Sequence, residues 1–329
     1  MTFILRRLGF FVLTLWAALT LNFFIPRFMP GSPLQALRDR THNKLSPDAL
    51  QQMLTSYGFK PHQPLGVQYL EYLKNMVTGN WGISIGATLG EPVKQLVGQA
   101  LPWTLGLVGI ATVLAFVIGT MVGIVAGWKR GGKLDAILPP VFVVTSALPY
   151  FWVGLLFILV FSVWTNGFLP SDFNYDNTLQ PSLSMPFVLS VLQHGILPAA
   201  TILITSIGGW ILTMRNNMIT TLAEDYVRMG RAKGLSNRHI MYGYAARNAL
   251  LPNLSGFAMS LGFVISGAIL VEYVFNYPGL GYLLYNAVQN SDFPLMQALF
   301  MLFTVAVLLA VLICDFATAW LDPRARAKG

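Results

Sequence analysis

The chain has 329 residues, of which 55% are hydrophobic and only 10% are charged, and its formal net charge is +8. Soluble domains carry about 25% charged residues, so this composition excludes an ordinary soluble globular protein. A basic chain can bind nucleic acid, but these lysines and arginines gather in a few connectors between apolar runs, which argues against a nucleic-acid partner. The composition therefore predicts an all-α integral membrane protein.

Six apolar segments are long enough to cross the hydrocarbon layer, which takes roughly 20 residues in a helix. They lie at 8–28, 101–128, 136–164, 196–214, 251–271 and 294–320. The third contains Pro149 and the fourth Pro198. Prolines in spanning helices are tolerated where neighbouring helices satisfy the freed carbonyls. We therefore predict six transmembrane helices packed as a bundle.

The segment between the first two spans is too polar to cross the membrane. Met-Pro-Gly-Ser-Pro at 29–33 is a turn signal, and Ser46 followed by Pro47 is typical of a helix start. We expect a small extracytoplasmic segment of short helices here. The expected division is a first transmembrane helix at 1–28, this segment at 29–94, a core of five helices at 95–320 with a cytoplasmic loop at 215–250, and a tail at 321–329.

Lysines and arginines are distributed unevenly between the connectors. With a cytoplasmic N-terminus, the inner segments hold fourteen of them, whereas the two short outer loops at 165–195 and 272–293 hold none. The other seven lie at Arg27 and in the long segment that follows it, and long segments cross largely regardless of charge. Because cytoplasmic loops carry the excess of basic residues, we predict that both termini are cytoplasmic.

Three glycines, Gly119, Gly123 and Gly127, recur every four residues in the second span. Small residues at this spacing let two helix backbones approach closely in lipid. We therefore predict that these glycines pack one helix against another.

The stretch at 127–133 nearly matches a phosphate-binding loop. Leu134 stands where the loop needs a hydroxyl for Mg²⁺, and the stretch follows an apolar helix rather than a strand. The four histidines are scattered without metal-ligand spacing. The spans contain no Ser/His, Cys/His or paired-carboxylate arrangement. The sequence therefore predicts no nucleotide site, no metal site and no catalytic residues.

A basic connector at 215–250 separates the fourth and fifth spans. It is long for a connection inside a compact bundle. Gly234 suits the end of one helix, and Ser236 suits the N-cap of the next. We predict two short helices broken at Gly234.

The motifs of this connector and of several other segments resemble one family. Asp-Tyr-Val-Arg at 225–228, Arg-Ala-Lys-Gly-Leu at 231–235 and Arg-Asn-Ala-Leu-Leu-Pro at 247–252 look like the coupling loop of binding-protein-dependent ABC permeases. Segments 80–84, 147–154, 271–281 and 321–324 fit the same family. The resemblance covers essentially the whole chain and is to the first permease subunit of the dipeptide/oligopeptide branch. It implies the type I ABC importer permease fold, with 95–320 as the permease core.

The resemblance implies that the connector docks a short helix into a groove on a separate ATPase subunit. The residues that it places at this contact are Asp225, Tyr226, Arg228, Arg231, Ala232, Lys233, Gly234 and Leu235. A solvated basic loop that only sets orientation is the alternative, but such a loop needs neither this length nor the helix break. ATP and magnesium would be bound by the ATPase subunits, and this chain would bind no cofactor of its own.

The implied assembly has a second homologous permease subunit, two ABC ATPases and an extracytoplasmic substrate-binding protein. It would sit in the lipid of a bacterial or archaeal cytoplasmic membrane. Glu272, at an outer helix end, is expected to face the loop or a partner. The candidate contacts with the binding protein are Phe173, Tyr175, Tyr277, Pro278 and Gly279.

The leading function is a permease subunit that forms half of a translocation path for peptides. The same branch includes transporters of oligosaccharides and metal chelates, and residues 210–218 depart from the commoner peptide-permease form, which keeps the oligosaccharide alternative open. A self-sufficient secondary transporter or channel is less favoured because the chain shows no internal repeat and few intramembrane charges. An intramembrane enzyme would need a catalytic pair that the spans lack.

Overall fold

The computed structural model describes residues 2–28, 63–86, 88–266 and 268–321, together with isolated positions at 38, 46, 52 and 55. The regular elements in these ranges are all helices, as the composition predicts. The predicted turn at 29–33 and Pro47 of the predicted helix start lie outside the described residues.

Within the described residues, four helical segments are long and apolar enough to cross a membrane: Leu5–Ile25, Val93–Trp128, Met185–Leu222 and Phe293–Cys314. They belong to α1 (Thr2–Phe28), to the continuous run of α5 (Val93–Thr104), the π-helical η1 (Leu105–Gly109) and α6 (Ile110–Trp128), to α9 (Met185–Leu222), and to α15 (Phe293–Leu321). The helix α9 extends beyond the predicted 196–214 at both ends, because Pro198 is accommodated inside it rather than near its start.

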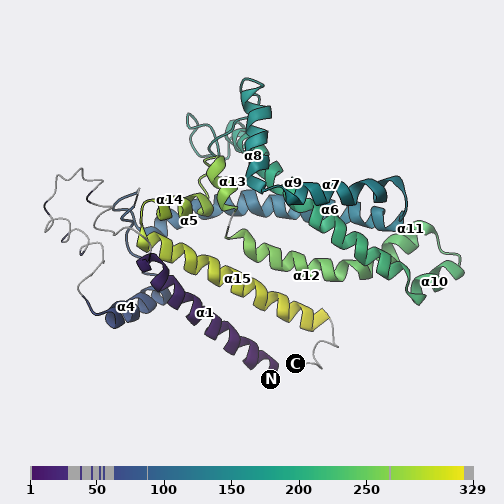
Figure 1. Ribbon diagram of the computed structural model, residues 1–329, viewed down its shortest axis with the longest axis horizontal. Helices are drawn as coiled ribbons and strands as arrows, with labels where there is room; N and C mark the ends of the chain where they lie inside the picture. Colours follow the sequence, from purple (N-terminus) through teal and green to yellow (C-terminus); the bar gives the residue numbers. More distant parts are fainter. Residues whose placement is uncertain are drawn as a thin grey trace.

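The third predicted span, at 136–164, is divided into separate helices at Pro149, one of the prolines expected to interrupt it. It consists of α7 (Lys133–Ala147), then α8 (Tyr150–Ile158) and the π-helical η2 (Leu159–Val163). Leu148 between α7 and α8 is extended, with φ −78° and ψ 130°. A residue that precedes proline avoids the helical region, so Pro149 forces this break. Figure 1 shows that α8 turns steeply away from the direction of α7.

The fifth span is also placed differently from the predicted 251–271. A helical run begins at α11 (Asn237–His239), continues through the π-helical η3 (Ile240–Ala246) and ends with α12 (Arg247–Val264). Ser266 donates a hydrogen bond of 2.6 Å to the carbonyl of Phe263, which satisfies one of the last acceptors of α12. The chain then forms the short helix α13 (Ile269–Val274).

The long helices lie side by side in Figure 1, with α15 between α1 and α12, and with α6 and α9 beyond α12. The helices α4 (Leu65–Thr78) and α14 (Leu280–Gln289) lie toward one end of this bundle. The helices α10 (Asp225–Ala232) and α11 lie at the other end. The short helices therefore lie at opposite ends of the bundle.

Among the described helices, α6 and α9 make the most extensive contact, and the three regularly spaced glycines lie in it. A Cβ on Gly119 would come within 2.6 Å of the Trp210 Cβ, and one on Gly127 within 2.5 Å of the Met218 Cβ. A Cβ on Gly123 would lie 2.7 Å from the carbonyl oxygen of Ile211. The two backbones approach this closely because each glycine removes a side chain from the contact.

Two carboxyl groups are fully buried at the end of the bundle that carries α14, outside the spanning helices. Glu272, in α13, accepts a hydrogen bond from the Thr104 hydroxyl at 2.9 Å and others from the backbone N–H groups of Gly281 and Tyr282 at 2.7 and 3.1 Å. It therefore faces the outer loop at 272–293, which is one of the two expected positions, and caps the start of α14 within that loop. Burial raises the pKa of the Glu272 carboxyl, and these hydrogen bonds offset part of the rise.

Asp292 has the same role at the start of α15. Its carboxylate accepts from the backbone N–H of Leu295 at 3.3 Å and of Gly86 at 2.9 Å, and from the hydroxyl of Ser84. Asp292 thereby ties the segment before α5 to the first turn of α15. Burial likewise raises the pKa of this carboxyl.

Candidate functional site

The connector at the basic end forms two helices separated by a break at Gly234. The helix α10 ends at Ala232, and Gly234 has a positive φ of 74°, a conformation that glycine adopts at little cost. The N–H of Leu235 then bonds to the carbonyl of Gly230 at 3.3 Å. Ser236 caps α11, and its hydroxyl oxygen accepts from the N–H of His239 at 3.4 Å. The geometry is the helix–break–helix arrangement that Gly234 and Ser236 predict.

One face of α10 is packed against the rest of the molecule. Val227 and Gly230 are buried, and a Cβ on Gly230 would touch the ring of Tyr244 in η3 at 3.7 Å. The hydroxyl of Tyr226 accepts a hydrogen bond of 3.0 Å from the Asn248 side chain in α12. The helix is therefore held against η3 and joined by this hydrogen bond to the first turn of α12.

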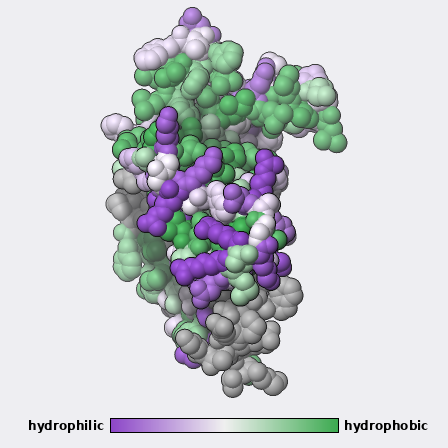
Figure 2. All heavy atoms as spheres, turned by 90° about the vertical axis from the view of Figure 1, so that its right-hand side faces the viewer, coloured by the Kyte–Doolittle hydropathy of each residue, from purple (hydrophilic) through white to green (hydrophobic). Residues whose placement is uncertain are grey.

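The other face of α10 and the break are exposed and mostly basic. The exposed predicted coupling residues are Asp225, Tyr226, Arg228, Arg231, Ala232, Lys233 and Gly234, and Leu235 is half-buried. The only acidic member, Asp225, lies 3.6 Å from Arg228, and both are exposed, so the pair neutralises little. Figure 2 faces this end and shows hydrophilic side chains gathered on it with apolar ones around them. Such a surface suits a partner that presents carboxylates.

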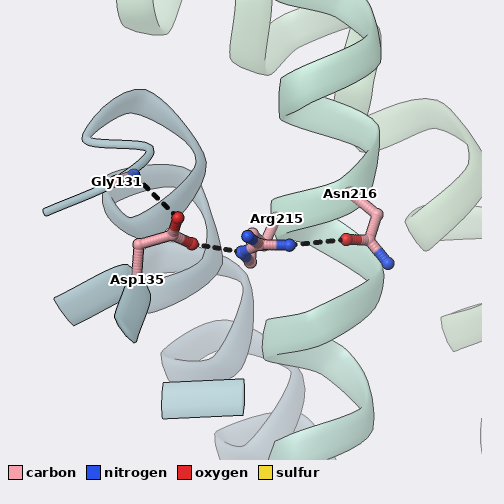
Figure 3. Close-up of polar contacts among 4 residues, drawn as sticks. All are labelled: Gly131, Asp135, Arg215 and Asn216. Carbon is pink, nitrogen blue, oxygen red and sulfur yellow. Dashed lines mark hydrogen bonds and ion pairs between the residues drawn. The ribbon is translucent and has the colours of Figure 1, made fainter. Parts of the chain in front are cut away.

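An ion pair at the same end, which was not predicted from the sequence, joins α7 to α9. The Arg215 guanidinium in α9 pairs with the Asp135 carboxylate in α7 (Figure 3). Asp135 also accepts from the N–H of Gly131 at 2.8 Å, and Arg215 donates to the Asn216 side chain at 3.0 Å. The one sequence feature that could have indicated this ion pair is Asp135, a lone aspartate beside a basic loop. The pair fixes where α7 starts relative to α9.

The outer aromatic candidates divide into exposed and buried residues. Phe173 is 43% exposed, with a positive φ of 60°. Tyr175 is half-buried and stacks on Trp103 with 5.7 Å between ring centroids. The Phe173 and Tyr175 side chains can therefore still contact a partner protein.

The structure corrects the prediction for Tyr277 and Gly279, which are buried. Tyr277 is only 3% exposed and packs in a core cluster with Leu107 and Leu197. Gly279 is buried, and a Cβ there would lie 2.4 Å from a carboxylate oxygen of Glu272. Pro278 between them is half-buried. The motif at 277–279 therefore builds the start of α14 and offers little contact surface.

A cavity of about 540 Å³ lies between η1 with the first turn of α6, the middle of α9, and the last turns of α12. Five of its lining residues carry hydroxyl groups and none is charged. The lining consists of Val108, Thr112, Ile202, Ser206, Gly209, Trp210, Thr213, Ser260, Phe263, Val264 and Ser266. The hydroxyls of Ser206, Ser260 and Ser266 already donate to nearby backbone carbonyls, so they can only accept from a bound polar group. The hydroxyls of Thr112 and Thr213 can donate or accept. Among the described residues no group of three or more His, Cys, Asp or Glu side chains could hold a metal ion.

Comparison with known proteins gives a consistent family. The model of the family described as "Binding-protein-dependent transport system inner membrane component" matches residues 119–327. This range begins at the first of the packing glycines in α6 and contains α9, the connector with α10 and α11, and α12.

Individual relatives match over nearly the full length. The dipeptide transport system permease protein DppB of Lactococcus lactis is 31% identical over 98% of this chain and 99% of its own. The oligopeptide transport system permease protein AppB of Bacillus subtilis is 33% identical over 98% of both chains. The di/tripeptide transport system permease protein DppB of Pseudomonas aeruginosa is 32% identical over 99% of both.

Proposed function

The chain belongs to the family of binding-protein-dependent transport system inner membrane components, and we propose on that premise that it is the multi-pass permease subunit of an ATP-driven peptide importer. The observation that carries this proposal is the likeness, over nearly the whole chain, to relatives named as dipeptide, oligopeptide and di/tripeptide permeases. The substrate class is taken from those names. The uncharged, hydroxyl-lined cavity is compatible with it, because a peptide backbone offers amide donors and carbonyl acceptors whatever its side chains are.

The exposed face of α10 and the break at Gly234 form the proposed contact with a separate ATPase. ATP and magnesium are bound and used by that partner. The exposed Arg228, Arg231 and Lys233 pair with its carboxylates, and the contacts of Tyr226 with Asn248 carry the movement into α12. This chain contributes α10, which passes the movement to α12, and half of the translocation path.

The complete transporter contains a second homologous permease, two ATPases and an extracytoplasmic binding protein. The second permease supplies the other half of the path, and Phe173 and Tyr175 are the proposed contacts with the binding protein. Both chain termini face the cytoplasm of a bacterial or archaeal cell. The position of the basic connector at one end of the bundle supports this orientation.

The coupling contact is tested with Gly234→Leu in the reconstituted transporter. Leucine at a positive φ costs roughly 1 kcal/mol and displaces the α10 surface, so substrate-stimulated ATP hydrolysis and peptide uptake should fall while membrane insertion stays intact. The matched control is Gly79→Leu, since Gly79 also ends a helix at a positive φ, of 71°, with no atom close to an added Cβ, but at the opposite end. Normal hydrolysis and uptake in Gly234→Leu would show that the contact lies elsewhere.

The substrate is tested on the partner binding protein by calorimetry against panels of peptides, oligosaccharides and metal chelates. Peptide binding supports the proposal, and binding of only another panel moves the chain to that substrate class. Transport by the purified chain without any ATPase would instead indicate a self-sufficient transporter.

A further inference from the structure

A cluster of three aromatic rings adjoins the hydroxyl-lined cavity through one of its members. Trp210 of α9 lines the cavity, and its ring meets that of Phe116 in α6 edge-on, with 5.2 Å between centroids. Phe116 in turn stacks on Phe257 of α12 at 4.1 Å. Three helices are thus joined at one level by aromatic contacts, which are specific in geometry and exclude water.

Two buried polar side chains lie directly beyond this ring cluster. The helices α6 and α12 are antiparallel, as the contacts of Phe116 with Phe257 and of Gly109 with Val264 show. Thr120 is one turn after Phe116, and Asn253 is one turn before Phe257, so both lie on the side of the rings toward the basic connectors. We call Thr120 and Asn253 the polar pair.

The polar pair is buried without hydrogen-bond partners. Asn253 is 1% exposed and Thr120 is 6% exposed. Neither amide atom of Asn253 nor the hydroxyl oxygen of Thr120 has a partner among the described residues. Buried polar groups are normally paired, and an exception calls for a physical reason. On α6, Phe116 lies between Thr112 of the cavity and Thr120. On α12, Phe257 lies in the same way between Ser260 of the cavity and Asn253.

We propose that the ring cluster of Phe116, Trp210 and Phe257 is a closed gate, and that Thr120 and Asn253 form a second contact site for the backbone amides of a peptide once this gate opens. The inference rests on the proposed peptide-import function. In the closed state the polar pair has no partner, and in the open state the passing amide groups or water supply one. The indole of Trp210 packs against α12 at Gly256, 3.6 Å from an added Cβ, while the wall beside it is open at Gly209. The gate therefore has room to move on its cavity side.

Cysteine labelling tests the gate in the full reconstituted transporter. The native Cys314 is replaced by alanine, and Thr112→Cys in the cavity is compared with Thr120→Cys beyond the rings, using a small cationic methanethiosulfonate reagent. Thr112→Cys should react at rest. Thr120→Cys should be protected at rest and react about tenfold faster during ATP-driven peptide turnover, because the open state is then populated. Phe257→Ala should remove the protection at rest. A Thr120→Cys reaction rate that is unchanged by turnover and by Phe257→Ala would overturn the proposal.

Asn253→Leu tests the contact site itself. Removing an unpaired buried amide should leave the thermal unfolding midpoint unchanged or higher, yet lower peptide uptake per ATP hydrolysed severalfold. Asn217→Leu is the matched control, since Asn217 donates to the carbonyl of Ala249 at 3.2 Å and its loss should lower the midpoint. Unchanged uptake in Asn253→Leu, or loss of uptake together with a lower midpoint, would reject the contact site. If the wild-type complex imports no peptide at all, the proposed function has failed instead.

Discussion

Single buried carboxyl groups organise the end of the bundle away from α10. Glu272 and Asp292 each receive backbone N–H groups from the first turn of a helix and a hydroxyl from a distant segment, Thr104 or Ser84. The helix dipole stabilises a carboxylate at a helix N-terminus, and this offsets part of the free-energy cost of burying the charge. Because these partners are 168 and 208 residues away along the chain, the sequence around each acid gave no sign of its burial.

Glu272→Ala should destabilise the protein by about 2 kcal/mol or more, because it leaves buried donors unpaired. Burial raises the folded pKa of Glu272, so the stability linked to its protonation is fully present below the unfolded pKa of about 4.3 and is lost as the pH rises through the folded pKa. The loss caused by Glu272→Ala should therefore be larger at acidic than at alkaline pH. Thermal unfolding of the detergent-solubilised variant and wild type, at one acidic and one alkaline pH, measures this difference in stability. Glu91→Ala, at an exposed glutamate, is the control. Equal effects of the two substitutions would contradict the capping role.

Helix packing is the scale at which sequence patterns predicted most. The four-residue glycine spacing in α6 marks its contact with α9, because the spacing alone places the three glycines on one face. The helix break at Gly234 was likewise visible, since both the glycine and the cap at Ser236 act locally. Composition also identified the long apolar helices.

The sequence did not predict the directions of the helices or the contacts between residues that lie far apart in the chain. Pro149 signals a break, but the angle at which α8 leaves α7 depends on what each packs against. Tyr277 resembled an exposed loop aromatic, and its burial depends on Leu107 and Leu197 from other helices. The polar pair was missed for the same reason, because Thr120 and Asn253 are brought together only by the antiparallel packing of α6 and α12.

Gly123→Ala should weaken the contact between α6 and α9. The added Cβ would lie 2.7 Å from both the Ile211 carbonyl oxygen and the Met214 Cβ, and the backbone oxygen cannot move away cheaply. Overpacking of this kind costs about 1–3 kcal/mol. Gly98→Ala, in the same helical run, meets no atom within 4 Å and should be neutral or slightly stabilising. Thermal unfolding of the two variants side by side decides the matter, and equal stability would show that α6 and α9 are not locked by this glycine.

At the scale of the whole molecule, charge separates a basic end from an uncharged cavity, which we propose to be part of the translocation path. The basic connectors gather where α10 and α11 lie (Figure 2), and the cavity is lined by hydroxyl and apolar groups. Fixed charge in the path would hold some peptides tightly and repel others. A neutral path leaves selection to the binding protein and energy to the ATPase, which is the division of labour that the proposed assembly requires.

The proposed orientation of the chain in the membrane rests on the same charge asymmetry and can be measured directly. Leu183 in the outer loop is fully exposed at 100%, and Asn237 at the start of α11 is exposed at the basic end. In a Cys314→Ala background, Leu183→Cys should react with a membrane-impermeant maleimide in intact cells, or in spheroplasts where an outer membrane is present. Asn237→Cys should react only after permeabilisation, because moving its basic surroundings outward opposes the charge rule that orients membrane proteins. Labelling of Asn237→Cys from outside would place α10 and α11 beyond the reach of any cytoplasmic ATPase, and the coupling role assigned to them would then be untenable.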